Sequence, residues 1–288
     1  MKDVVLIPCY RRAEFLQICL EKLAQNKELK HMAIVFHVDF GFSRSVIDVI
    51  ERFNHSDKRV FYNQRHSFKN KLSPNLLRGY KKAAMIAKDY IFMIEEDVMV
   101  SNDFFKWHYL VQSQENLFCS IATKNNNRDV QVDNDLSSYY LSHLDYQSLG
   151  VCFNKSVIKN YVIQYDNNEY YKDLRGFVKK EFPNSKLPHQ WCEQAGVIRR
   201  VQERSELPIA FPHIPRAFHA GFYGKNRGNA PSGNFAQRVH MINKIIFDKN
   251  EMRKAASNDR YYLDSMPVNL VNDINYKHIV RHPLEVQK

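Results

Sequence analysis

The first hundred residues alternate short apolar runs with amphipathic segments, and this alternation constrains the fold more than any other feature of the chain. Short apolar runs bounded by turn residues are typical of buried strands, whereas apolar residues three and four positions apart indicate helices. Repeated strand–helix units form a mostly parallel sheet with helices on both faces. We expect strands at 4–8, 33–38, 59–62 and 90–94, and helices at 13–24, 46–53 and 74–87.

The pattern becomes mixed after residue 97, without a linker or an internal repeat. We therefore expect an α/β first half at 1–104, a mixed α+β second half at 105–235 that packs on it as one unit, and a helical tail at 236–288. In the second half we predict helices at 104–112, 156–162, 170–181 and 189–200, strands at 117–122 and 207–211, an apolar stretch at 146–153, a polar loop at 124–138 and a late helix at 235–247.

Three acids, Glu95, Glu96 and Asp97, follow the fourth predicted strand directly. Each pair of like charges about 4 Å apart costs roughly 4 kcal/mol at an effective dielectric near 20, so a divalent cation or raised pKa values must relieve the cluster. Open α/β sheets bind ligands at the carboxyl ends of their strands. We interpret the triplet as a metal site. In the alternative interpretation, successive strand side chains alternate between faces and the acids only mark a strand-to-helix turn.

Composition indicates a soluble protein, because the chain is 44% hydrophobic and has no apolar run near the roughly 20 residues that cross a bilayer. No secretory signal precedes the first strand, and the five cysteines are scattered without a close pair. We expect no membrane partner and a reducing cytoplasm.

Positive charge is concentrated in one segment. The formal net charge is +11, and residues 52–88 contain ten Lys or Arg against one acid, Asp57. Such a segment attracts polyanions such as nucleic acid through release of counterions. A solvated surface that only improves solubility is the commoner explanation of a charge run.

The usual nucleotide-binding signatures are missing, since no G-x-G-x-x-G follows the first strand and no P-loop motif occurs. This disfavours Rossmann dehydrogenases and P-loop enzymes. The first strand instead ends in Pro8-Cys9 and leads to Arg11-Arg12, and the second leads to Asp39. One of the two arginines can approach a base or a phosphate, and Asp39 can accept a base N–H. Two capped turns would also explain these residues.

Several segments carry a resemblance to a known family when they are taken in order over roughly residues 3–240. They are Pro8-Cys9-Tyr10-Arg11, Val38-Asp39-Phe40-Gly41, Ile94-Glu95-Glu96-Asp97-Val98, Asn102-Asp103-Phe104-Phe105, Gln190-Trp191-Cys192-Glu193 and Pro215-Arg216-Ala217-Phe218-His219-Ala220-Gly221. This succession resembles glycosyltransferases of the GT-A fold, and is most similar to the N-glycan N-acetylglucosaminyltransferase that initiates hybrid and complex branches. That family has Glu-Asp-Asp where this chain has Glu95-Glu96-Asp97.

The resemblance implies an enzyme that moves a hexose or N-acetylhexosamine from a UDP-sugar to a hydroxyl with the help of Mn²⁺ or Mg²⁺. It implies that Asp97 binds the metal and that Glu96 contacts the donor ribose, with Glu95, Pro8 and Cys9 beside the donor. It further places Arg11 and Asp39 at the uridine and assigns Glu193 as the catalytic base. An inverting single displacement fits one base and no evident nucleophile.

Two departures from the family pattern concern the acids: Glu96 stands where the family has Asp, and Cys192-Glu193-Gln194 stands where it has two acids and a Trp. Many GT-A enzymes use a late histidine as a metal ligand, so His219 is a further candidate, although a structural histidine is the alternative. The stretch 216–229 combines glycines with Arg216 and Lys225. We expect it to be a flap over the diphosphate; an ordinary surface loop is the alternative.

The acceptor is suggested by a second resemblance. The 219–224 stretch is similar to phage and kinetoplastid glycosyltransferases associated with TET/JBP-type oxygenases, which modify 5-hydroxymethylpyrimidines in DNA. A DNA acceptor would use the basic segment and a flipped base, with Tyr139, Tyr140, Trp191 or Tyr223 available for stacking. Two alternatives remain: transfer to a glycan, lipid-linked sugar or protein, and an inactive transferase fold that only binds DNA.

Overall fold

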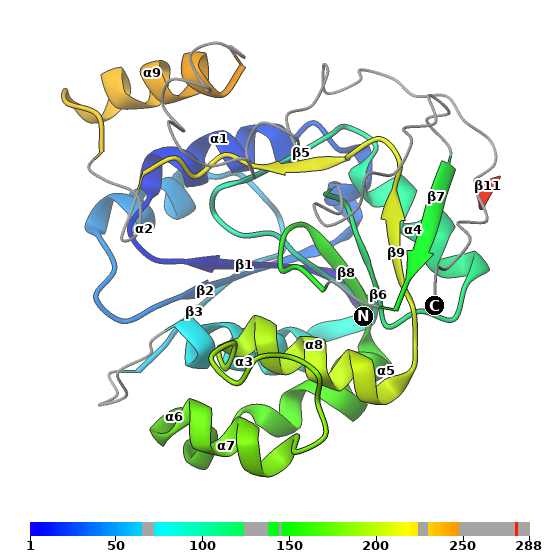
Figure 1. Ribbon diagram of the computed structural model, residues 1–288. Coiled ribbons are helices and arrows are strands. Elements are labelled where there is room, and N and C mark those ends of the chain that lie inside the picture. Colours follow the sequence, from blue (N-terminus) through cyan, green and yellow to red (C-terminus); the bar gives the residue numbers. More distant parts are fainter. Residues whose placement is uncertain (65–71, 124–137, 144–145, 224–229, 248–279, 282–288) are drawn as a thin grey trace.

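The computed structural model describes residues 1–64, 72–123, 138–143, 146–223, 230–247 and 280–281. Within this part of the chain, a large mixed sheet lies between two layers of helices (Figure 1). No helix of the described residues combines the length and the apolar character that crossing a membrane requires.

The first half contains the predicted parallel strands. They are β1 (Lys2–Cys9), β2 (Ala33–Val38), β3 (Lys58–Tyr62) and β4 (Ala87–Met93). Strand β1 lies between β2 and β4, and β3 pairs with β2. Every residue of β2 is buried, because a parallel sheet covered on both faces leaves no solvent side.

Helices cover both faces of these strands, as the alternation predicted. Helices α1 (Ala13–Leu23) and α2 (Arg44–Arg52) lie on one face and α3 (Leu72–Ile86) on the other (Figure 1). Along β1, Val5 and Ile7 pack into the core beneath α1, whereas Val4 and Leu6 pack into the core beneath α3. This division follows from the two-residue period of a strand, and burial stabilises each such side chain by about 1.5–3 kcal/mol.

The second half continues the same sheet. Its strands are β6 (Cys119–Ile121), β7 (Ser138–Ser142), β8 (Val151–Asn154), β9 (Ile209–Pro212) and β11 (Val280–Arg281). Its helices are α4 (Phe104–Gln114), α5 (Lys155–Val157), α6 (Asn168–Lys172), α7 (Leu174–Glu181), α8 (Gln194–Ser205) and α9 (Phe235–Phe247), and two further helical turns are Ile158–Val162 and Ile163–Tyr165. The strand order is β11-β7-β9-β6-β8-β4-β1-β2-β3. Because β8 is antiparallel to both β4 and β6, the parallel first half passes into a mixed second half.

Some elements differ from the prediction. A separate antiparallel pair of three-residue strands, β5 (Val98–Val100) and β10 (Ala217–His219), was not predicted. The single helix predicted at 170–181 is two helices, since Asp173 interrupts it and its carboxylate caps α7 by accepting from the Gly176 N–H (2.9 Å). The helix predicted at 189–200 begins later, at Gln194.

Candidate functional site

The parallel strands bring their carboxyl ends together at one edge of the sheet. The Asp39 N–H donates to the Cys9 carbonyl (2.8 Å), and the Asn63 N–H donates to the Val38 carbonyl (2.8 Å). The Ile94 N–H donates to the carbonyl of Leu6 (3.0 Å), so the acids that follow β4 lie beside the end of β1. We call Glu95, Glu96 and Asp97, with the adjoining end of β1, the acid edge.

Asp97 is fully buried at the centre of the acid edge. Its Oδ2 accepts a hydrogen bond from Nη1 of Arg12 and lies 2.7 Å from Nε2 of His219. Residue His219 reaches Asp97 because β10 pairs with β5 and sets His219 opposite Val98. Burial opposes ionisation of Asp97, yet Arg12 and His219 hold its pKa below the usual range. In return, Asp97 raises the pKa of His219 against the effect of burial.

Arg12 bridges two of the acids. Its Nε donates to Oε1 of Glu96 (2.9 Å), and Oε2 of the same carboxylate accepts from the Tyr10 N–H (2.8 Å). Burial raises the pKa of Glu96 although Arg12 opposes this rise. The guanidinium of Arg11 lies elsewhere, 4.8 Å from the centre of the Tyr10 ring, and its Nε donates to the Gly41 carbonyl (2.6 Å). The Arg11-Arg12 pair therefore divides, and only Arg12 touches the acids in these contacts.

Glu95 is oriented toward the second half of the chain. Its Oε1 accepts a hydrogen bond from the Ser148 hydroxyl (3.0 Å). Burial and the neighbouring charge of Asp97 raise the pKa of Glu95 to about 7. Glu95 thus has a partner of its own, whereas Glu96 and Asp97 share Arg12, and all three acids remain within one electrostatic cluster.

Residues 220–223, which we call the strap, cover Asp97. The Ala220 N–H donates to the Asp97 carbonyl (2.8 Å), and a Cβ at Gly221 would lie 2.0 Å from Oδ2 of Asp97. Only glycine allows the backbone to pass this close. The Tyr223 hydroxyl donates to Oε2 of Glu14 on α1 (2.8 Å), which fixes the other end of the strap.

A second polar group lies at the ends of β2 and β3. Oδ1 of Asp39 accepts from the Phe40 N–H (2.8 Å) and from Nδ2 of Asn63 (3.0 Å). Oδ1 of Asn63 in turn accepts from Nη1 of Arg78 on α3 (2.7 Å). We did not predict Asn63 as a site residue, although the rule that pointed to Asp39, a polar residue directly after a parallel strand, applies equally to Asn63.

Glu193 is exposed and precedes the first residue of α8. The next N–H, that of Gln194, donates to the Ser73 hydroxyl near the start of α3 (3.1 Å). Helix α3 begins near the carboxyl end of β2, since Oδ1 of Asn75 lies 2.6 Å from Nδ1 of His37. The structure thus brings Glu193 to the same edge of the sheet from the second half of the chain.

The remaining residues that we predicted for the donor site lie in different places. Pro8 and Cys9 are buried at the end of β1, and the Cys9 thiol, whose pKa is raised by burial, donates to the Ile7 carbonyl (3.4 Å). Arg216 is 1% exposed and its Nε pairs with Oδ2 of Asp103 (3.2 Å), so we leave it out of the proposed donor site. Lys225 lies outside the described residues.

The residues around Asp97 fit a divalent cation in part. Across the described residues, Oδ1 of Asp97 is buried without a hydrogen-bond partner, and a carboxylate with an imidazole is a suitable donor pair for Mn²⁺. The same part of the chain contains no group of three His, Cys, Asp or Glu side chains that could hold a metal ion unaided. Mg²⁺ and similar ions are commonly bound by one or two protein carboxylates with substrate phosphates and waters. The donor set therefore fits a cation that arrives with a phosphate ligand.

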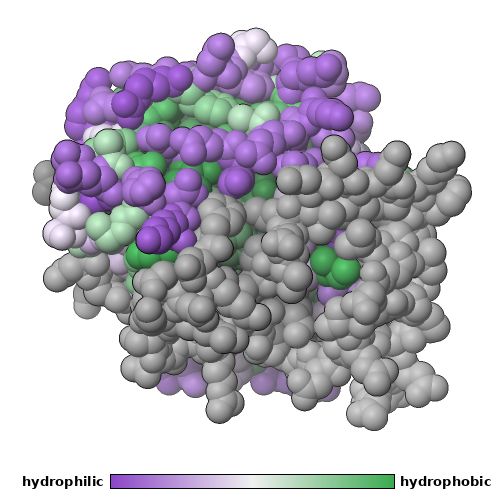
Figure 2. Space-filling model, turned by 90° about the horizontal axis from the view of Figure 1, so that it is seen from above, coloured by the Kyte–Doolittle hydropathy of each residue, from purple (hydrophilic) through white to green (hydrophobic). Residues whose placement is uncertain are grey.

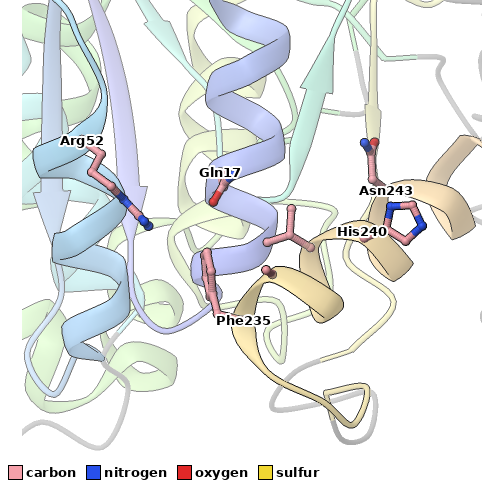
Figure 3. A pocket seen from close by; sticks show the side chains of 7 residues that line it. Gln17, Arg52, Phe235, His240 and Asn243 are labelled. Carbon is pink, nitrogen blue, oxygen red and sulfur yellow. The ribbon is translucent and has the colours of Figure 1, made fainter.

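A separate groove opens on the helical face. It has a volume of about 390 Å³, and its lining residues are Gln17 of α1, Arg52 of α2, and Phe235, Ala236, Val239, His240 and Asn243 of α9 (Figure 3). The Arg52 guanidinium lies 5.7 Å from the centre of the Phe235 ring. Viewed from the side of α9, hydrophobic residues show between hydrophilic ones (Figure 2). None of the predicted site residues lines this groove.

The fold is similar to that of solved glycosyltransferase structures. Residues 1–349 of S. aureus TarS match with a TM-score of 0.51 and 13% identity over 88% of this chain and 66% of that one. The same TarS fragment in complex with UDP-GlcNAc matches with a TM-score of 0.50 and 13% identity over 89% and 70% of the two chains. The mannosyltransferase PcManGT from Pyrobaculum calidifontis is more remote, with a TM-score of 0.43 and 8% identity over 90% and 65%.

These likenesses establish the fold, which is the predicted GT-A architecture of a large, mostly parallel sheet flanked by helices. The chain spans 66% of the length of the first TarS structure. No protein-family profile matches the chain, and no curated protein sequence matches it.

Proposed function

We propose that the protein is a glycosyltransferase that uses a UDP-sugar as donor together with Mn²⁺ or Mg²⁺. The observation that carries this proposal is the buried Asp97 carboxylate at the strand ends, with His219 at 2.7 Å and, among the described residues, an unpartnered Oδ1. Ligands of open α/β sheets bind at this edge. The UDP-GlcNAc complex of TarS, a structure of similar fold, supports a UDP-sugar as the donor class.

In the proposed donor complex, Asp97 and His219 hold the cation, while Arg11 and Asp39 recognise the uridine and Glu96 the ribose. When bound, the cation supplies positive charge that stabilises the leaving diphosphate. The hydrogen bonds that Asn63 and the Phe40 N–H donate to Asp39 fix this carboxylate before a base arrives. A preorganised acceptor of this kind favours a base that presents an N–H.

The proposed chemical step is an inverting single displacement. The acceptor hydroxyl oxygen forms a bond to the anomeric carbon of the sugar while the bond from that carbon to the β-phosphate oxygen breaks. The acceptor proton passes to the carboxylate of Glu193, and UDP leaves with the bonding electron pair. Glu193 suits this role because it is exposed at the start of α8, on the same edge as the acids but on the other half of the chain.

We further propose that the acceptor is a 5-hydroxymethylpyrimidine in DNA. Two features support it: the net charge of +11, and Trp191, which is 48% exposed two residues before Glu193 with the Arg199 guanidinium 5.3 Å from its ring centre. An exposed aromatic ring next to the proposed catalytic base, Glu193, can stack on a flipped nucleobase. The basic segment contributes less than its count suggests, because Nζ of Lys58 donates to the carbonyls of Ile50 and Phe53.

The deciding experiment incubates the protein with a panel of UDP-sugars, Mn²⁺ and three acceptors: DNA with 5-hydroxymethylpyrimidines, the same DNA without hydroxymethyl groups, and an oligosaccharide. Nucleoside mass spectrometry and UDP release are measured. We expect transfer to hydroxymethylated DNA alone, and none by the Asp97→Asn variant. Transfer to the oligosaccharide alone would overturn the DNA acceptor and keep the transferase. DNA binding without turnover of any UDP-sugar would instead identify an inactive transferase fold.

A further inference from the structure

Arg12 occupies the carboxylate that the proposed cation needs. Its Nη1 donates to Oδ2 of Asp97, and its Nε donates to Oε1 of Glu96 at 2.9 Å. The side chain of Arg12 is 27% exposed, whereas that of Asp97 is fully buried. The arginine therefore reaches the buried acids from the solvent side of the acid edge and closes the approach to one face of Asp97.

Arg12 acts as an internal counterion for the buried acids. Although burial alone would lower the pKa of Arg12, the charges of Asp97 and Glu96 raise it above its usual range, so the guanidinium stays charged. A buried carboxylate without a partner is strongly unfavourable, and a paired guanidinium removes that cost in the absence of ligand. A divalent cation bound to Oδ2 of Asp97 would be repelled by the positive charge of Arg12, which binds the same oxygen.

We propose that Arg12 competes with the divalent cation for Asp97 and is released from it when cation and donor bind together. Once released, the partly exposed guanidinium is available to the diphosphate of the donor, for which a planar, forked donor is well suited. The chain would thereby couple the two ligands: the cation alone binds weakly, and the diphosphate compensates by giving Arg12 a new partner. This inference rests on the proposed function and adds a positioning role for a residue of the β1–α1 turn.

The coupling follows from thermodynamic linkage. If the diphosphate draws Arg12 away from Asp97, it raises the affinity for the cation, and the cation must raise the affinity for the diphosphate by the same factor. Oδ1 of Asp97, which has no hydrogen-bond partner among the described residues, is a cation donor in either state of Arg12, and Nε2 of His219 joins it once this nitrogen has lost its proton. Arg12 thus couples the binding of the two ligands without being a cation ligand.

The test measures free Mn²⁺ by electron paramagnetic resonance during titration of the protein without and with UDP. Without UDP, we expect Arg12→Met to bind Mn²⁺ roughly tenfold more tightly than wild type, because an ion pair in contact no longer has to be broken. With Mn²⁺ present, the same variant should bind UDP more weakly. Arg12→Gln retains an amide donor for one carboxylate, so it provides a second variant if Arg12→Met folds poorly; circular dichroism checks both.

Arg44→Met is the matched control. Arg44 also bridges two acids, with Nε 2.8 Å from Asp48 and Nη2 3.2 Å from Glu51, but it lies exposed on α2. Its replacement should leave Mn²⁺ affinity unchanged. Unchanged or weaker Mn²⁺ binding by both Arg12 variants, with wild type still binding Mn²⁺ and UDP together, would overturn this inference alone. Failure of wild type to bind Mn²⁺ at saturating UDP would overturn it together with the metal part of the proposed function.

Discussion

Replacing Gly221 by alanine tests how closely the strap packs on Asp97. The added Cβ would lie 2.0 Å from Oδ2 of Asp97 and 2.9 Å from Nη1 of Arg12, which is far inside normal contact distance. Either the Asp97 side chain must rotate or the strap must lift. Because Asp97 is fully buried, neither movement has free space to use.

The expected loss in the free energy of unfolding follows from the contacts that each movement breaks. Rotation of Asp97 disturbs its hydrogen bonds to charged partners, which are worth about 1.5–3 kcal/mol each. Lifting the strap breaks the bond from the Ala220 N–H to the Asp97 carbonyl and strains the bond from Tyr223 to Glu14. We expect Gly221→Ala to lower the free energy of unfolding by about 2–4 kcal/mol, consistent with overpacking of a filled site.

The assay is urea unfolding followed by far-UV circular dichroism, together with UDP binding in the presence of Mn²⁺. Gly79→Ala on α3 is the matched control, because its Cβ would meet the two Leu6 methyls at 3.2 and 3.4 Å and the His37 Cβ at 3.5 Å, with no contact below 3.0 Å. A leucine side chain can adjust, so we expect a change below about 1 kcal/mol and unaltered UDP binding. If Gly221→Ala matched wild type in both stability and UDP affinity, the packing of the strap on Asp97 would be refuted.

Three further predictions concern separate parts of the molecule. Glu193→Gln should retain UDP binding and lower the transfer rate about 10²–10⁴-fold, and single-turnover kinetics at saturating donor would show whether it transfers at the wild-type rate instead. Asn63→Ala should weaken UDP binding roughly tenfold or more and reduce the preference of the protein for UDP over CDP, because Asp39 loses a hydrogen-bond donor. Calorimetry with both nucleotides would test this. Burial, aided by Arg216, holds the pKa of His108 well below its usual range. As pH falls through about 6.5, His108 therefore gains a proton in the unfolded chain before it does so in the folded protein, and the folded state loses stability. Urea unfolding should show the free energy of unfolding declining by up to about 1.4 kcal/mol per pH unit, and declining less steeply in His108→Gln. An equally steep decline in that variant would refute the assignment.

The sequence was sufficient to predict the elements whose pattern, an apolar run or a helical period, extends over a whole segment. Strand β2 and helix α9 have the predicted bounds, and the acids follow β4 as expected. The three-residue strands β5 and β10 are too short to show a period of two, so their pairing, which brings His219 to Asp97, could not be predicted. Turn geometry decided between Arg11 and Arg12, and no local pattern reports that geometry.

The charges at the acid edge explain why one arginine and one divalent ion need not be redundant. Without ligand, Arg12 balances part of the charge of Glu96 and Asp97, which lets these carboxylates remain buried. A diphosphate would add negative charge to the same edge, and the single positive charge of one guanidinium cannot balance the buried acids and the phosphates together. A divalent cation at Asp97 would restore the balance only if Arg12 turned to the incoming anion. We therefore interpret the ion pair between Arg12 and Asp97 as the contact that is present before ligands bind and that the cation and the diphosphate replace.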